Sequence, residues 1–252
     1  MLPFWIALQF LTVIPVQLSR IPNQTENARS VLYYPLIGLL IGLILYSLSW
    51  LLSPVPHLLS ASLILIIWIW LTGGLHLDGL ADTADAWVGG FGDKQRTLEI
   101  MKDPSCGPIG VLSLIAVCLL KWVCIYLLLE QHLALFLIFV PLLGRVVPLI
   151  LLLTTSYVRE NGLGRHLAKD LPKKSAWLIS LMVLLSLLYL KLQGVLSLLV
   201  FLTGLIYLRH LFIKRINGIT GDTIGASIEL LETTLLLSFI LSGFYLLMFS
   251  GQ

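Results

Sequence analysis

The sequence predicts an all-α integral membrane protein, with about seven transmembrane helices and one short apolar segment at the amino terminus. Three observations support this fold class. Of 252 residues, 58% are hydrophobic and 12% are charged, about half the charged fraction of a soluble domain. Several apolar runs reach the roughly 20 residues that a helix needs to cross a hydrocarbon core. The basic residues gather in alternate loops.

The apolar runs define the expected spans in chain order. They are 31–52, 58–74, 109–129, 133–153, 176–190, 194–211 and 232–249. Segment 4–16 is apolar but too short to span, and it lacks the basic start and cleavage site of a signal peptide. We therefore expect an interfacial or re-entrant helix there. No repeat, low-complexity tract or flexible linker divides the chain, so residues 1–252 are predicted to form a single membrane domain.

The charged residues predict an orientation in the bilayer. Of the 16 Lys and Arg residues, 13 fall in loops on one side of the expected spans, whereas Lys191 alone falls in a loop on the other. The positive-inside rule places the amino terminus in the cytoplasm and the carboxyl terminus in the periplasm. Twelve of the 13 acids also lie on the cytoplasmic side, although acids contribute little to orientation. This bias predicts a chemical surface facing the cytosol at the inner membrane.

Three aspartates form the first candidate site. Asp78, Asp82 and Asp85 stand at i, i+4 and i+7, which places them on one helical face within about 60° and over roughly 10 Å of axis. Aligned carboxylates repel unless a cation lies among them, and Mg²⁺, with Mn²⁺ as an alternative, prefers such oxygen ligands. The alternative, a solvated helix face, suits so apolar a chain less well. The neighbouring His76 is interpreted as a general base, a metal ligand or a hydrogen-bonding partner of these carboxylates.

A second polar segment, 98–110, leads into the expected span that begins at 109. Pro104 predicts the end of a short helix, and the backbone N–H groups near Gly107 open the next one, where anions are often bound. Lys102, Asp103 and Gly107 are therefore candidate substrate-binding residues. A Pro/Gly-rich helix start is also ordinary punctuation, so the segment taken alone is a weak signal.

A third segment, 217–229, repeats the geometry of the first. Asp222 and Glu229 are seven residues apart with small residues between them, and we predict that both are further metal ligands. The turn before Asp222 suits a phosphate, although an ordinary capped helix start is equally compatible. The candidate substrate-binding residues here are Lys214, Arg215, Thr220 and Gly221.

Arg145 is a charged residue inside the expected span 133–153. A charge in a span is costly and is by default a functional hypothesis. The flanking Pro and Gly residues predict an interrupted helix that lines a polar cavity. The alternative is a side chain that snorkels to the cytoplasmic interface. The predicted catalytic residues are Asp82, His76 and Arg145.

Together these features favour a metal-dependent enzyme of phosphoryl-group chemistry at the inner leaflet, where a metal and basic groups stabilise phosphate charge. A transporter is the competing class, and its signature is ionisable residues lining a midplane pathway. Only Arg145 and Lys121 match that signature. A scaffold subunit would need no row of aspartates. The expected partners are the lipid bilayer and a phosphate-bearing substrate, not nucleic acid.

The three motifs resemble the cobalamin synthase family, the adenosylcobinamide-GDP ribazoletransferases. The similar strings are HLDGLADTADA, LEIMKDPSCGPIG and NGITGDTIGASIE, preceded by QFLTVIP and PLIGLLIG. The resemblance implies a Mg²⁺-dependent enzyme that joins adenosylcobinamide-GDP to alpha-ribazole or its 5′-phosphate, giving adenosylcobalamin or its phosphate and GMP. It also implies that the ribazole hydroxyl attacks the phosphorus nearer the corrinoid, with GMP as the leaving group.

The chain also departs from this family pattern. The departures are Leu77 in place of a usual acid, Ala86 in place of a common Gly, and Val13 and Cys106 in place of frequent Arg residues. The remaining candidates for phosphate contacts are Arg145, Lys102, Lys214 and Arg215. The aspartate motif also resembles, more loosely, the CDP-alcohol phosphotransferases, so action on a lipid or another alcohol is an alternative function. A homo-oligomer and an association with other corrinoid-pathway enzymes are both left open.

Overall fold

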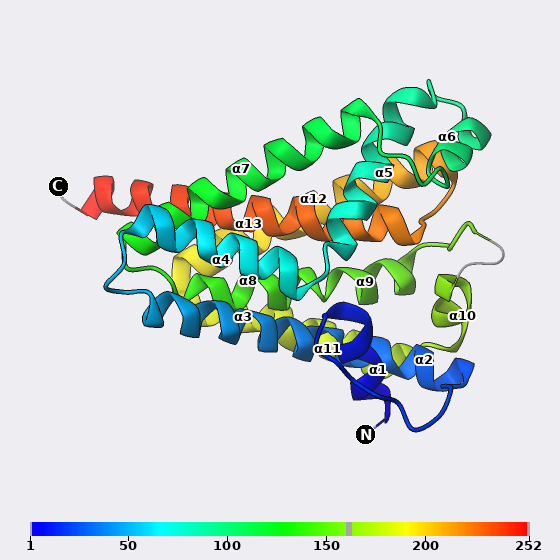
Figure 1. Cartoon of the computed structure of the whole chain (residues 1–252), viewed down its shortest axis with the longest axis horizontal. Helices are drawn as coiled ribbons and strands as arrows, with labels where there is room; N and C mark the ends of the chain where they lie inside the picture. Colours follow the sequence, from blue (N-terminus) through cyan, green and yellow to red (C-terminus); the bar gives the residue numbers. More distant parts are fainter. Residues whose placement is uncertain (1, 160–162, 251–252) are drawn as a thin grey trace.

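The computed structural model describes residues 2–159 and 163–250, with side chains described up to Gly243 at the carboxyl end. All regular secondary structure in these residues is helical, and the one β-bridge is isolated, between Tyr157 and Ile219. The longer helices run roughly along one axis (Figure 1). The all-α prediction is confirmed for the described residues, because in a bilayer each helix satisfies its own backbone hydrogen bonds.

The amino-terminal segments begin at one end of the bundle, and the last of them, α3, runs along the bundle against α8 (Phe136–Gly144), as Figure 1 shows. They are α1 (Leu2–Leu11), α2 (Gln24–Ser30), η1 (Val31–Tyr33) and α3 (Tyr34–Leu51). Helix α1 is apolar and too short to span, as expected for this segment. Helix α2 begins with a capping box, in which Asn23 and Glu26 each bond the other's backbone N–H. From Gln24 to Leu51 the helical run is long and apolar enough to cross a membrane.

A sharp bend brings the aspartate motif out of line with its preceding helix. Helices α4 (His57–Leu71) and α5 (Leu75–Gly89) meet at 86°. Gly73 and Gly74 at the bend have φ angles of 61° and 66°, a region that glycine adopts without steric cost. We take α4 as the membrane segment of this pair and α5 as its polar arm, since α5 carries all three aspartates of the first motif.

The central part of the chain contains two further apolar runs. Its helices are α6 (Lys94–Ile100), α7 (Pro108–Glu130), α8 (Phe136–Gly144) and α9 (Val147–Thr154). Helix α7 passes as one span, and α8 with α9 passes as another. The interruption expected around Arg145 is confirmed, because α8 ends at Gly144 and α9 begins two residues after Arg145.

The carboxyl-terminal half contains two of the expected spans within one long apolar run. Its elements are α10 (Leu163–Asp170), α11 (Lys173–Ser186), η2 (Leu187–Leu190), α12 (Lys191–Ile216) and α13 (Gly221–Ser250). The seven expected spans correspond to five long apolar runs, or six with the bent pair, because 176–190 and 194–211 fall in one 44-residue run. In a straight helix, residues seven apart are separated by about 10 Å along the axis. Gly194 and Leu187 are much closer than this, since a Cβ at Gly194 would lie 1.7 Å from the Leu187 carbonyl oxygen. The chain therefore turns sharply between α11 and α12.

Helix α13 is the central helix of the bundle. It packs against α5, α7, α8, α9 and α12, and its Phe239 ring stacks on Phe136 of α8 at 4.2 Å between centroids. It begins at Gly221, which is 11 residues before the predicted start of the last span at 232. The outer faces of α7, α11 and α12 expose apolar side chains such as Leu112, Leu181 and Ile206. Such faces suit contact with lipid.

Candidate active site

The first and third motifs meet where α5 crosses the start of α13 (Figure 1). A Cβ at Gly79 would lie 2.9 Å from the Asp222 carbonyl oxygen, and one at Gly225 would lie 3.3 Å from the His76 backbone. Any residue larger than glycine at position 79 would push the helices apart. The crossing therefore brings together acids about 140 residues apart in the chain.

The acids at this crossing carry more negative charge than the nearby cation offsets. Burial, together with the neighbouring carboxylates of Asp78 and Asp222, raises the pKa of Asp82 to about 6 against the opposing effect of Arg159. The Arg159 guanidinium donates to the Asp222 carboxylate and, at 3.0 Å, to the Met101 carbonyl. Three carboxylates and one guanidinium leave a net negative site among the described residues.

The donor set at the crossing fits Mg²⁺ by its chemistry. In the described parts of the chain, no three His, Cys, Asp or Glu side chains converge closely enough to hold an ion by themselves. Mg²⁺ commonly keeps several waters and takes one or two carboxylates together with substrate phosphates, so a complete protein cage is not needed. The carboxylates of Asp78 and Asp82, and that of Asp222 beside Arg159, are suitable ligands for such an ion.

Asp85, the third aspartate of the row, has a different set of partners. Its two carboxylate oxygens accept from the backbone N–H of Gly107 at 2.7 Å and of Gly110 at 2.9 Å. The start of α7 therefore binds an anion as expected, but that anion belongs to the protein. The Gly107 N–H expected to meet substrate is occupied by Asp85.

Glu229 lies in a buried ion network and not beside the aspartate row. Lys121 of α7 bonds Glu229 and Glu232 at 2.6 Å each, and Arg145 bonds the other oxygen of Glu232. All four side chains are buried, and the Lys121 ammonium also lies 4.5 Å from the centre of the Trp68 ring. Two cations and two acids neutralise one another, which lowers the cost of charge inside a span.

This network corrects two expectations from the sequence. Glu229 and Glu232 lie within the apolar run Gly221–Gly243, so they do not belong to the cytoplasmic surface. Arg145 is 1% exposed, so it does not snorkel to the interface. It also lies outside the lining of the cavity described next.

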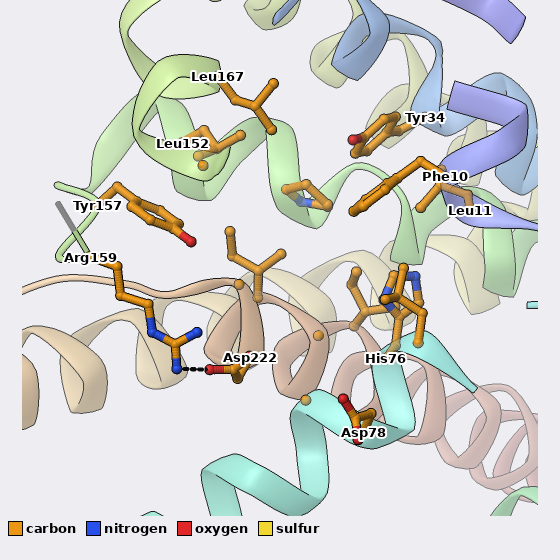
Figure 2. Close-up of a pocket in the computed structure, with 18 residues that line it drawn as sticks. Phe10, Leu11, Tyr34, His76, Asp78, Leu152, Tyr157, Arg159, Leu167 and Asp222 are labelled. Carbon is orange, nitrogen blue, oxygen red and sulfur yellow. Dashed lines mark hydrogen bonds and ion pairs between the residues drawn. The ribbon is translucent and has the colours of Figure 1, made fainter. Parts of the chain in front are cut away.

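A cavity of about 320 Å³ opens beside the crossing of α5 and α13. Figure 2 shows Asp78, Asp222 and Arg159 along one edge, with aromatic and aliphatic side chains around the remaining space. The apolar lining includes Phe10, Leu11, Tyr34, Leu152, Tyr157 and Leu167. Of the predicted site residues, the cavity is lined by His76, Asp78, Gly221 and Asp222. The Nε2 atom of His76 is buried without a hydrogen-bond partner.

The predicted basic residues lie away from this cavity. Lys102 lines a separate shallow depression on α6, and Lys214 is exposed on the last turn of α12. Arg215 holds the fold together instead, since its guanidinium donates to the Thr97 hydroxyl at 2.9 Å and the Trp87 carbonyl at 2.6 Å. These contacts tie α12 to α6 and to the end of α5.

Two further predicted residues make local backbone contacts. The Asp103 carboxylate accepts from the Ser105 N–H at 2.9 Å, and this contact lowers the Asp103 pKa. The Thr220 hydroxyl accepts from the Thr223 N–H at 3.2 Å, while the Thr223 hydroxyl accepts from the Thr220 N–H at 2.8 Å. Thr220 therefore caps α13, the ordinary alternative considered for this segment.

Sequence reasoning missed Arg159 and the aromatic wall of the cavity. Arg159 follows a short bridge in which the Val158 N–H donates to the Ile219 carbonyl at 2.9 Å. That bridge places Arg159 against the start of α13. No spacing pattern signals this contact, whereas Phe10 does fall within the recognised string QFLTVIP.

Comparison with known proteins gives a consistent family assignment. The family described as cobalamin-5-phosphate synthase matches residues 3–240. An adenosylcobinamide-GDP ribazoletransferase from Acinetobacter baumannii is 63% identical over 98% of this chain and 100% of that protein. Proteins of the same name from Pseudomonas fluorescens and Pseudomonas putida are 50% and 51% identical, each over 96% of this chain and at least 99% of their own length. No solved structure matches the chain.

Proposed function

Because the chain belongs to the cobalamin-5-phosphate synthase family, we propose that the crossing of α5 and α13 is the catalytic centre of its transfer reaction. The activity is the one that names its relatives, the joining of adenosylcobinamide-GDP to alpha-ribazole or its 5′-phosphate. The products are adenosylcobalamin or its phosphate and GMP. The chain is a multi-pass membrane transferase of cobalamin biosynthesis.

The observation that carries this proposal is the uncompensated negative charge at the crossing. One or two of the carboxylates of Asp78, Asp82 and Asp222 would hold Mg²⁺, or Mn²⁺ as a substitute, together with the diphosphate of adenosylcobinamide-GDP. A bound divalent ion supplies neutralisation of the diphosphate and of the charge that develops on the departing GMP. Acids without such an ion would repel the substrate, since their net charge has the same sign as the phosphates.

The protein's own residues position the reacting groups. Arg159 fixes the Asp222 carboxylate by its ion pair and lies along the cavity edge, where its guanidinium can meet a phosphate oxygen. The ribazole hydroxyl oxygen bonds to the phosphorus nearer the corrinoid as the bond from that phosphorus to GMP breaks, and the hydroxyl releases its proton. Lys102 and Lys214, both exposed, remain candidate contacts for the guanosine diphosphate part.

The direct test uses purified protein in detergent with both substrates and a titration of Mg²⁺. We expect the corrinoid product and GMP to form in equal amounts, with no turnover in excess chelator and full recovery when Mg²⁺ is restored. Undiminished turnover in chelator would contradict the metal requirement. Release of GMP with transfer of the corrinoid phosphate to water or a lipid alcohol, and without adenosylcobalamin or its phosphate, would instead favour the alternative alcohol phosphotransferase.

We further propose that the amino terminus and the acidic crossing face the cytoplasm, with the carboxyl terminus in the periplasm. The support is the one-sided distribution of loop Lys and Arg residues. A periplasmic reporter fused after Gln252 should be active, and the same reporter inserted near Lys169 should be inactive. Activity at both positions would overturn this topology without affecting the assignment of the reaction.

A further inference from the structure

We propose that the 320 Å³ cavity beside the crossing is the binding site for alpha-ribazole, with its aromatic base in the apolar interior and its ribose at the acidic edge. This inference rests on the proposed function, and it assigns one of the two substrates to one place. The other substrate, adenosylcobinamide-GDP, would then approach the crossing from outside the cavity.

The size of the cavity separates the two substrates. Pockets for small organic molecules commonly have volumes of about 300–1,000 Å³, so this cavity is near the lower end. Alpha-ribazole consists of one bicyclic aromatic base, a benzimidazole with two methyl groups, and one ribose. Adenosylcobinamide-GDP contains a corrin macrocycle, an adenosyl group and a nucleoside diphosphate, and is several times larger. Only the smaller substrate fits.

The lining of the cavity matches a flat aromatic base. Phe10 of α1 and Tyr34 of α3 form a stacked pair, with ring centroids 5.9 Å apart and planes 19° apart. Figure 2 shows this pair on one side of the cavity and Leu152, Leu167 and Tyr157 on the other. Aromatic and branched side chains on both sides suit a planar ring, which they can cover on its faces and edges.

The acidic edge of the cavity determines the orientation of the ligand, with the ribose end beside the carboxylates. Asp78 and Asp222 can accept hydrogen bonds from ribose hydroxyls, and the reacting hydroxyl must reach the crossing where the diphosphate is held. A lipid is the other apolar ligand that a membrane protein meets. The stacked rings of Phe10 and Tyr34 favour a planar base over the flexible acyl chains of a lipid.

His76 adds a polar group to the otherwise apolar wall. It is 6% exposed, and its Nε2 has no hydrogen-bond partner, an arrangement that is uncommon for buried polar atoms. A benzimidazole base has one ring nitrogen that is not joined to ribose and that accepts a hydrogen bond. The His76 imidazole is therefore the group we assign to recognise that nitrogen.

The first experiment narrows the cavity with Leu167→Phe and measures both KM values. We expect the KM for alpha-ribazole to rise about tenfold or more, as in the loss of a well-fitted apolar contact. The KM for adenosylcobinamide-GDP should change less than twofold. The matched control is Leu181→Phe on the outer face of α11, where the side chain is 54% exposed, and neither KM should change.

A smaller base should partly rescue the narrowed cavity. The second riboside carries benzimidazole without the two methyl groups. Its kcat/KM should fall less in Leu167→Phe than the kcat/KM of alpha-ribazole does. The variant should therefore use the two ribosides equally or prefer the smaller one, unlike the unmodified enzyme. A rise only in the KM for adenosylcobinamide-GDP, or no change in base preference, would overturn the assignment of the cavity. The unmodified enzyme would still form product, so this failure is distinct from failure of the proposed function.

The second experiment tests His76 with a riboside whose base is indole, in which the free ring nitrogen is replaced by a C–H group. The unmodified enzyme should prefer benzimidazole by at least about tenfold in kcat/KM, since an unmet buried donor is costly. His76→Gln should keep part of this preference and His76→Leu should lose it. Equal use of both ribosides by the unmodified enzyme would contradict the role of His76, even if a variant failed to fold.

Discussion

Helix α13 contributes to two groups of acids whose surroundings differ. At its start Asp222 lies with Asp78 and Asp82 beside a single guanidinium, that of Arg159. Two turns further along, Glu229 and Glu232 are matched by two cations in a buried network. Acidic side chains thus leave a net negative charge in one place and form a neutral buried network in the other. The comparison shows that compensation, and not the presence of acids, distinguishes the site.

The buried network has a structural consequence for the break in the fourth apolar run. Arg145 lies at the interruption between α8 and α9, and its partner Glu232 lies on α13. Lys121 joins the same acids from α7. The network therefore connects three separate helical runs around one neutral group of charges. Loss of the network should lower the stability of the fold more than it lowers the rate of turnover.

The largest effect is expected when one acid of the network is removed. Glu232→Leu leaves Arg145 and Lys121 with one acid between them, and an uncompensated buried charge costs about 3–5 kcal/mol. The unfolding temperature in detergent and the yield of inserted protein measure this loss. The double variant Arg145→Leu/Glu232→Leu keeps Lys121 with Glu229 and should recover most of the stability. A double variant as unstable as the single one would show that neutrality is not what the network provides.

The next effect concerns turnover at the uncompensated site. Asp82→Asn keeps the size of the side chain and removes its charge, so turnover should fall about 100-fold or more while the fold is retained. Turnover and the unfolding temperature are measured together. Glu99→Gln, which removes an exposed acid on α6, should leave both near normal. Near-normal turnover in Asp82→Asn would mean that the aspartate row is only a solvated face.

A smaller effect is expected at the other side of the crossing. Asp222→Asn should raise the Mg²⁺ concentration for half-maximal activity about tenfold, as commonly seen when a group supporting a metal is lost. Combined with Asp82→Asn it should be far from additive, because groups that serve one site fail together. An unchanged metal requirement with a lower unfolding temperature would assign Asp222 to the fold alone.

The pH dependence of metal binding should distinguish the two acidic groups further. The pKa of Asp82 is raised to about 6, so below that pH a proton occupies the carboxylate and competes with the ion. Metal affinity should therefore fall about tenfold per pH unit below pH 6 and level off above it. Binding of Mn²⁺ to the protein, followed by its paramagnetic signal, measures this directly. Asp82→Asn should remove most of the dependence, and a pH-independent affinity in the unmodified protein would contradict the assignment.

The smallest effect is expected for Asp85, which caps α7 through Gly107 and Gly110. Asp85→Ala should cost about 1 kcal/mol of stability, in the range found for lost helix caps. The Mg²⁺ requirement should stay unchanged. A raised requirement would return Asp85 to the set of metal ligands that the spacing alone suggests.

The sequence by itself determined the fold class and one half of the site. Apolar runs of spanning length leave the backbone no hydrogen-bond partners outside the segment, so helices are the outcome. The spacing of Asp78, Asp82 and Asp85 places them on one side of α5 because a helical turn has 3.6 residues. The helix break at Arg145 could also be predicted from the sequence, because proline and glycine flank this charged residue.

Only the tertiary structure decided which acids are neutralised by nearby cations and which leave a net negative charge. Asp222 and Glu229 are related by the same spacing as Asp78 and Asp85, yet Glu229 meets Lys121 from 108 residues away in the chain. Asp222 forms an ion pair with Arg159 because an isolated β-bridge places Tyr157 beside Ile219. The local sequence pattern does not predict this bridge. Charge compensation depends on contacts between distant helices, whereas spacing encodes only the face of one helix on which a residue lies. The cavity beside the crossing likewise exists because residues of four separate helices, α1, α3, α9 and α10, enclose it together with α5 and α13.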